Sequence, residues 1–161
     1  MNTFQLWYAL CTNEVTCKNF SGVFAGDTLP PTLAVGDVVV CNTDKSDGPG
    51  KHWVVWYRRS EDEYEFFDSL GKKPDDYWVF PPFNYKRSTF LPSRIQSSDT
   101  NICGEMCLFY ILAALRGTRL PDIPFIMPFE QSLREIVSHS FVIPSSRINV
   151  NMQFNQESKY N

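Results

Sequence analysis

The sequence predicts a single α+β domain in which a central, mostly antiparallel sheet packs against a buried helix. Three observations predict it. The 161 residues fall within the range of about 100–200 that one hydrophobic core holds. Short β-branched and aromatic segments fill the middle of the chain and are separated by turn-forming residues. Apolar residues at helical spacing occur before and after them, and strands grouped between helices are typical of α+β folds.

The first third of the chain predicts one helix and two strands. Apolar residues recur at helical spacing from Thr3 to Cys11, so a short helix is expected there. Ser21–Phe24 predicts a short strand, and the β-branched run within Asp37–Asn42 predicts a buried one. Thr43–Gly50 is dense in Asp, Ser, Gly and Pro, which is typical of a loop.

Two strong strand patterns follow, at His52–Arg58 and Glu63–Asp68. The polar residues between them indicate a tight turn, so the pair is expected to form an antiparallel hairpin. We expect its aromatic side chains in the core, because no basic residues interleave them as a base-stacking surface would require. These aromatic residues are Trp53, Trp56, Tyr57, Tyr64, Phe66 and Phe67.

The second half predicts a central helix at Ile102–Arg116, because apolar side chains occur nearly all round it. Gly117 suits the position directly after that helix. Phe129–His139 predicts an amphipathic helix, and Lys86–Leu91 predicts a strand. The pattern at Asp75–Phe80 fits either one helical turn or a strand. We place the domain at residues 1–148 and a polar, flexible tail at 149–161.

Composition and charge exclude several classes of protein. Apolar residues make up 43% of the chain, which excludes a wholly disordered protein. A net charge of −3 argues against a chain built around phosphate-backbone binding. No apolar run approaches the roughly 20 residues of a membrane span, and the first residues lack the pattern of a signal peptide. The five cysteines are an odd number, and we expect free thiols in a reducing compartment.

Cys103 is the candidate nucleophile. It begins the predicted central helix, whose N-terminus carries about half a positive charge and favours a thiolate. Gly104 beside it permits a close approach of backbone to the Cys103 N–H. The other interpretation, equally compatible with the local sequence, is a small apolar residue in the first helical turn.

His52 and Asp68 are the candidate base and its orienting acid. If the hairpin turns near Ser60, residues about eight positions to either side lie opposite each other, so His52 and Asp68 become neighbours. A carboxylate beside an imidazole fixes its tautomer and stabilises the imidazolium. Taken singly, each residue is more typical of a surface histidine or a turn-capping aspartate. Their pairing across the hairpin favours catalysis.

Other polar and sulfur-containing side chains carry weaker signals. Gln96 precedes the nucleophile, and its amide is placed to donate to an oxyanion together with the Cys103 N–H. Cys107 lies four residues after Cys103, but no further ligands occur at zinc spacing, so we expect no metal and a core position for Cys107. His139 is expected to interact with the C-terminal end of its own helix.

The motifs Gly50-Lys51-His52-Trp53, Phe66 to Gly71, Gln96-Ser97-Ser98 and Cys103 to Cys107 occur in the order His, acid, Gln, Cys. With the approach Phe20–Pro30, this arrangement resembles the adenovirus-type (adenain-like) cysteine endopeptidases over residues 20–117. The version in Maverick/Polinton elements and related double-stranded DNA viruses is the most similar. The resemblance implies a papain-like, adenain-like fold.

The resemblance assigns His52 as general base, Asp68 as orienting acid, Cys103 as nucleophile, Gln96 as oxyanion-hole donor and Trp53 as an aromatic that shields the dyad. It implies protein or peptide substrates such as virion or capsid precursors, no cofactor and no membrane. It also implies a monomer inside the cell, in the host nucleus or cytoplasm or packaged in a virion, and not secreted. The need for an activating peptide or DNA stays open, because the region after Gly117 is short.

The sequence therefore predicts a cysteine endopeptidase acting through a Cys-His-Asp triad and an acyl-enzyme. Adenovirus enzymes usually carry Glu as the acid. Asp68 resembles instead the wider clan, which includes proteases for ubiquitin-like modifiers, so that substrate class is an alternative. A non-catalytic interaction domain that keeps the fold is a third interpretation.

Overall fold

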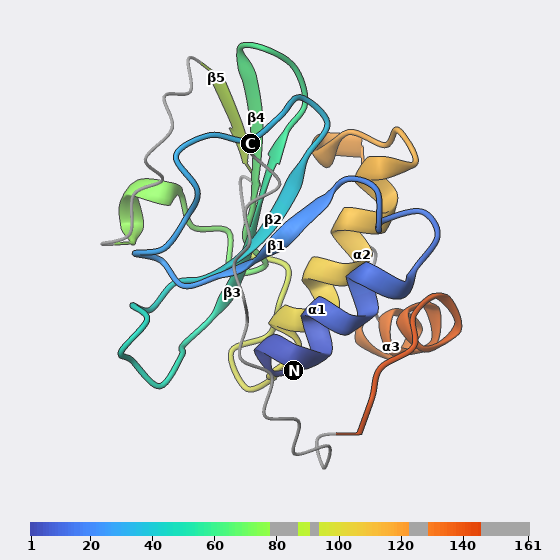
Figure 1. The fold of residues 1–161 in the computed structure, drawn as a ribbon. Coiled ribbons are helices and arrows are strands. Elements are labelled where there is room, and N and C mark those ends of the chain that lie inside the picture. The colour runs from blue at the N-terminus through green and yellow to red at the C-terminus, as the bar shows by residue number, and fades with distance from the viewer. Residues whose placement is uncertain (78–86, 91–93, 123–128, 146–161) are drawn as a thin grey trace.

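A computed structural model describes residues 1–77, 87–90, 94–122 and 129–145. The chain forms an α+β domain with a five-stranded sheet in the order β1-β2-β3-β4-β5 (Figure 1). The strands are β1 (Phe20–Phe24), β2 (Val38–Asn42), β3 (Trp53–Arg58), β4 (Glu63–Phe67) and β5 (Arg87–Phe90). The helices are α1 (Thr3–Thr12), α2 (Cys103–Leu115) and α3 (Phe129–Ser140), with short 3-10 turns at Pro74–Asp76 and Leu120–Asp122.

The sheet is mixed rather than mostly antiparallel. Strands β2, β3 and β4 are antiparallel, as the predicted hairpin requires. Strands β1 and β4 are each parallel to the strand that follows them in the chain, because the long connections after them carry the chain back to the same end of the sheet. The expected α+β class and the expected hairpin are confirmed.

Both faces of the sheet are covered, which explains why β2 and β3 read as almost continuous apolar runs. On one face, α1 and α2 lie side by side (Figure 1) and form a core cluster with Val40, Val55 and Phe67, while α3 packs against α2. On the other face, Leu29 and Leu33, from the segment between β1 and β2, cover alternate strand residues. The predicted core positions of the hairpin aromatic residues are confirmed.

Helix α2 lies at the centre of the domain, as its apolar surface predicts. Nine of its residues are buried, among them Cys107, whose predicted core position is confirmed. The helix ends before Gly117, whose φ of +94° is left-handed and suits glycine. The region predicted as either a turn or a strand begins with the 3-10 turn Pro74–Asp76. Residues 78–80 and the predicted tail lie outside the described residues.

A buried charge network joins the hairpin to α2. The Glu65 side chain is fully buried and accepts two hydrogen bonds from Arg59, at 2.8 and 3.1 Å. The Tyr110 hydroxyl donates to Glu65 Oε2 at 2.8 Å, and Arg59 also donates to the Thr118 carbonyl. Both oxygens of the Glu65 carboxylate therefore have a partner, which a buried charge needs in order to be tolerated.

We expect Arg59→Met to lower the free energy of unfolding by about 2–4 kcal/mol, because it leaves the Glu65 carboxylate buried without its cation. Arg119→Met is the matched control, since its pair with Glu63 is partly exposed and is expected to contribute less than about 1 kcal/mol. Chemical denaturation of both variants measures the difference. Equal losses of unfolding free energy in the two variants would contradict the greater contribution expected of the buried pair Arg59–Glu65.

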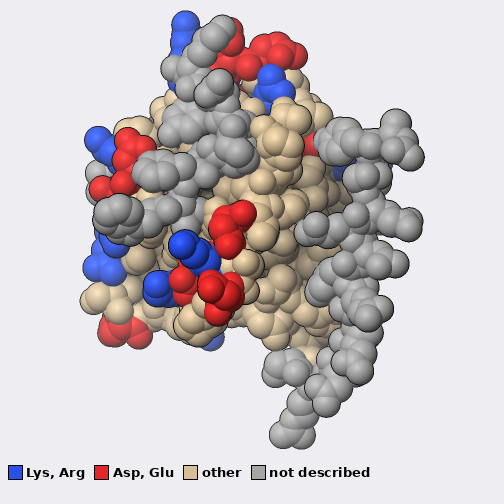
Figure 2. Space-filling model, turned by 60° about the vertical axis from the view of Figure 1, so that its left-hand side comes forward, with Lys and Arg blue, Asp and Glu red and all other residues tan. Residues whose placement is uncertain are grey.

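No helix among the described residues is long and apolar enough to cross a membrane. On the face shown in Figure 2, acidic and basic side chains lie near one another over part of the described surface, and other residues form the rest.

Candidate active site

Three of the four residues singled out from the sequence lie at the ends of secondary structure elements, and the fourth, Gln96, lies between two elements. Cys103 is the first residue of α2, and His52 directly precedes β3. Asp68 directly follows β4, and Gln96 lies in the segment leading to α2. All four are buried, with exposed fractions of 8% or less.

The expected contact between His52 and Asp68 is confirmed, because His52 Nε2 lies 2.6 Å from Asp68 Oδ1. The expected alignment was wrong by a small shift. Val55 pairs with Phe67, so the register continued by one residue places Asp68 level with Val54 and not with His52. The two side chains therefore meet diagonally beyond the paired part of the hairpin, within the reach that such neighbours have.

Asp68 is held by four hydrogen-bond donors. Besides His52, its carboxylate accepts from the backbone N–H of Leu70 at 2.8 Å and of Lys72 at 3.0 Å. The Tyr77 hydroxyl donates to Oδ2 at 2.6 Å. Burial acts to raise the pKa of Asp68, but the hydrogen bonds from His52, Tyr77 and Leu70 outweigh it and lower that pKa. Asp68 is therefore a fixed, ionised acceptor.

His52 links Asp68 to Cys103. Its Nε2 faces Asp68, which leaves Nδ1 as the other ring nitrogen, and Cys103 lies close enough to affect the pKa of the imidazole. Burial acts to lower the pKa of His52, but the hydrogen bonds to Asp68 and Cys103 raise it to about 9. An imidazole with this pKa is protonated at neutral pH.

The Cys103 thiol has the opposite shift. Burial acts to raise its pKa, whereas hydrogen bonds from His52 and from the Trp53 backbone N–H lower it below the ordinary value. The position at the first residue of α2 acts in the same direction. With the pKa of Cys103 lowered and that of His52 raised to about 9, the pair favours a thiolate beside an imidazolium.

Gln96 is fixed by hydrogen bonds at both ends of its amide. Its Oε1 accepts from the Ser69 hydroxyl at 2.6 Å, and its Nε2 donates to the Thr100 carbonyl at 2.8 Å. The Ser69 carbonyl also accepts from the backbone N–H groups of Ile95 and Gln96. One Nε2 hydrogen remains for another acceptor. The oxyanion role of Gln96 stays a prediction.

Trp53 is nearly buried, and its indole N–H donates to the Met1 carbonyl at 3.1 Å. It lines a surface groove together with Cys103. His139 lies within hydrogen-bonding distance of the Glu135 carbonyl, in the last turns of α3, as expected. Among the residues that the structure describes, no three His, Cys, Asp or Glu side chains are grouped to hold a metal ion.

Sequence reasoning missed Tyr77 and Ser69. Tyr77 follows a short 3-10 turn whose pattern gave no clear element, and its ring stacks on His52 with centroids 6.3 Å apart. Burial, then the hydrogen bond to Asp68, raises the pKa of Tyr77, so its hydroxyl keeps its proton and stays a donor. Ser69 directly follows Asp68 in the chain, and this position next to a candidate site residue could have pointed to it.

We expect Tyr77→Phe to lower kcat/KM for peptide cleavage about tenfold, because Asp68 loses a donor to its charged form. The loss raises the pKa of Asp68, so the acid limb of the pH–rate profile moves to higher pH. A purely structural role would leave the limb in place. Tyr8→Phe, on the outer part of α1, is the control that should alter neither quantity.

Comparison with known proteins gives structural similarity alone. No protein-family model matches the sequence, and no curated protein matches it. Two crystal structures of ASFV pS273R protease are similar to part of the chain. The first, of the selenomethionine protein, is 26% identical, with 66% of this chain and 45% of that chain covered and a TM-score of 0.42. The second is 22% identical, with 67% and 43% covered and a TM-score of 0.41. The chain thus spans less than half the length of those structures.

Proposed function

We propose that this protein is a cysteine endopeptidase whose nucleophile is Cys103. The observation that carries the proposal is the position of His52, which contacts the Asp68 carboxylate through Nε2 and lies close enough to Cys103 for each side chain to shift the pKa of the other. Acyl transfer by a thiol needs a nucleophile, a base beside it and a group that orients the base, and Cys103, His52 and Asp68 are arranged in that order.

In the first half of the reaction, Cys103 Sγ attacks the carbonyl carbon of a peptide bond and a C–S bond forms. The negative charge that develops on the oxygen is stabilised by the Cys103 backbone N–H and the free Nε2 hydrogen of Gln96. The C–N bond then breaks, and the His52 imidazolium gives its proton to the departing amine. A thioester remains on Cys103.

In the second half, neutral His52 removes a proton from water, and the resulting hydroxide attacks the thioester carbon. The C–S bond breaks, a carboxylic acid leaves, and the thiolate is restored beside the imidazolium. Asp68 keeps its charge throughout and holds the His52 ring in the tautomer that presents Nδ1 to sulfur.

The substrate class rests on the resemblance of the motifs around His52, Asp68, Gln96 and Cys103. It suggests virion or transposon precursor proteins, and it suggests the branch found in Maverick/Polinton elements and related viruses. The substrate class and the branch are both proposals, and the proposed chemistry does not depend on either of them.

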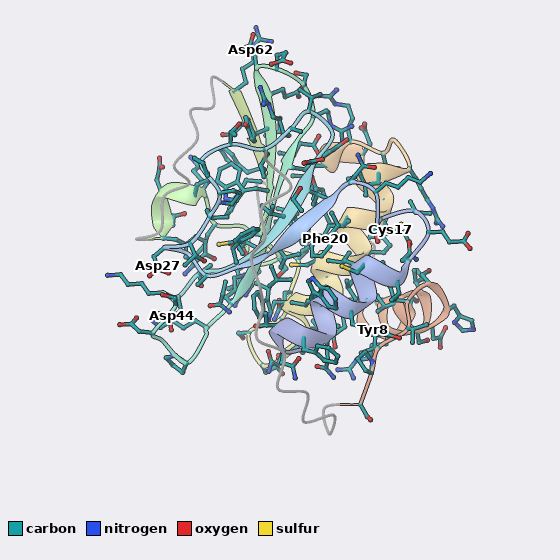
Figure 3. The ribbon with its side chains drawn as sticks, viewed as in Figure 1. Tyr8, Cys17, Phe20, Asp27, Asp44 and Asp62 are labelled. Carbon is teal, nitrogen blue, oxygen red and sulfur yellow. The ribbon has the colours of Figure 1, made fainter. Side chains whose placement is uncertain are left out.

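The proposal is tested by incubating the full-length protein with a panel of internally quenched peptides and with a peptide aldehyde. Cleavage, together with an aldehyde adduct mapped to Cys103 by mass spectrometry, is the expected result. Cys17 is the internal control, since it is an exposed free thiol in the segment after α1, away from the start of α2 (Figure 3). Absence of cleavage, or labelling of Cys17 in preference to Cys103, would instead favour a non-catalytic domain.

A further inference from the structure

The turn after β4 contacts two different parts of the proposed active site. It begins at Asp68, which contacts His52. The next residue, Ser69, is fully buried against the segment that leads to α2. Its carbonyl accepts from the backbone N–H groups of Ile95 and Gln96, at 3.0 and 2.9 Å. One turn therefore reaches both the orienting acid and the predicted oxyanion-hole donor.

The hydrogen bonds of Gln96 determine which way its side-chain amide points. A backbone carbonyl only accepts, so the amide nitrogen has to face the Thr100 carbonyl, 2.8 Å away. Oε1 then faces the Ser69 hydroxyl at 2.6 Å, and that hydroxyl has to donate because Oε1 is itself an acceptor. The reverse orientation would place Oε1 against the Thr100 carbonyl oxygen, which is also an acceptor. The amide thus has a single orientation.

The Ser69 hydroxyl is the group that restrains the oxygen end of this amide. Without it, Oε1 would be left without a donor in a side chain that is only 5% exposed. The last torsion of a glutamine side chain has a broad energy minimum, so the contact with Thr100 alone would hold the amide plane loosely. A donor stabilises an oxyanion best when it is already in place as the charge develops.

We propose that Ser69 is a positioning residue for the oxyanion: its hydroxyl fixes the Gln96 amide so that the free Nε2 hydrogen meets the oxygen that becomes negative. The inference rests on the proposed protease function and on the predicted role of Gln96. Ser69→Ala removes one neutral hydrogen bond, so kcat is expected to fall about tenfold with KM nearly unchanged. Gln96→Ala removes the donor itself and is expected to lower kcat about 10²-fold.

Steady-state kinetics on an internally quenched peptide that the full-length protein cleaves measures these losses. A double-mutant cycle shows whether they share one cause, because in the Gln96→Ala background Ser69→Ala is expected to cause no further loss. Ser69→Cys keeps the size of the buried side chain but offers only a weak donor, so its kcat should also fall several-fold. Ser60→Ala, in the exposed turn at the other end of the hairpin, is the matched control and should keep the unaltered rate.

Alkylation of Cys103 by iodoacetamide separates this role from a displacement of the neighbouring Asp68. Alkylation takes place at a saturated carbon, releases iodide and develops no oxyanion. Its rate and its apparent pKa should therefore be the same in Ser69→Ala and in the unaltered protein. A changed apparent pKa in Ser69→Ala would mean that the substitution acts through Asp68 and His52, and it would overturn the inference.

The outcomes separate the inference from the function on which it rests. Three results would overturn the role of Ser69 and leave the protease intact: an unaltered kcat in Ser69→Ala or Ser69→Cys, an unaltered kcat in Gln96→Ala, or a further loss when Ser69→Ala is added to Gln96→Ala. Absence of cleavage by the unaltered protein would overturn both proposals. Circular dichroism at the assay temperature establishes which variants are folded, and Ser69→Cys carries the test if Ser69→Ala unfolds.

Discussion

Replacing Cys103 by alanine is expected to lower kcat/KM for peptide cleavage by at least about 10⁴-fold. The substitution removes the sulfur that forms the thioester, and His52 can then act only on water. Cys103 is small and sits at the first residue of α2, so the truncated side chain costs little packing. Steady-state kinetics with a quenched peptide, alongside circular dichroism, measures activity and fold together.

The control for this prediction is Cys107→Ala. Cys107 lies one turn later on the same helix, is fully buried, and has a pKa raised by burial, so it is a packing residue with no nucleophilic role. Its variant should lose stability and keep cleavage. Wild-type cleavage by Cys103→Ala would assign the reaction to another residue.

Asp68→Asn is expected to lower kcat by about 10³–10⁴-fold. An amide in this position no longer stabilises the imidazolium, so the pKa of His52 falls from about 9 toward its ordinary value. The amide also brings an N–H group among donors that already point at Asp68, from Leu70, Lys72 and Tyr77. Single-turnover kinetics measures the loss in the chemical step.

Asp68→Asn is also expected to change the stability of the fold in a way that depends on pH. The pKa of Asp68 is lowered in the folded state, so its ionised form stabilises the fold above the unfolded pKa of about 3.9, and this contribution is lost as pH falls through the folded pKa. Asp68→Asn should therefore destabilise the protein at pH 7 and less so in acid. Asp75→Asn, at an exposed position, is the control. A deficit that stays constant with pH would contradict the account.

The order and type of the elements followed from the sequence because local patterns determine them. β-branched runs specified β2 and β3, and the all-round apolar surface of α2 indicated its central burial. The parallel pairing of the edge strands did not follow, because pairing partners depend on where long connections return and no local pattern records that.

The part of the site that the sequence predicts is the pair His52 and Asp68, because the number of residues on each side of the hairpin turn places them near each other. His52 and Asp68 had to come near each other once the turn was placed, although the register differed by a small shift. Tyr77 was not predictable, because its contact with Asp68 depends on the path of a short 3-10 turn. The Met1–Gly104 contact likewise joins segments that only the packed fold brings together.

The central claim is that His52 holds Cys103 as a thiolate, and the pH dependence of Cys103 alkylation by iodoacetamide tests it most directly. In the unaltered protein, the apparent pKa of alkylation should lie well below the value of about 8.5 for a free thiol. In His52→Ala it should rise to that value or above, because burial then acts without the imidazolium to oppose it. An apparent pKa at or above about 8.5 in both proteins would contradict the account.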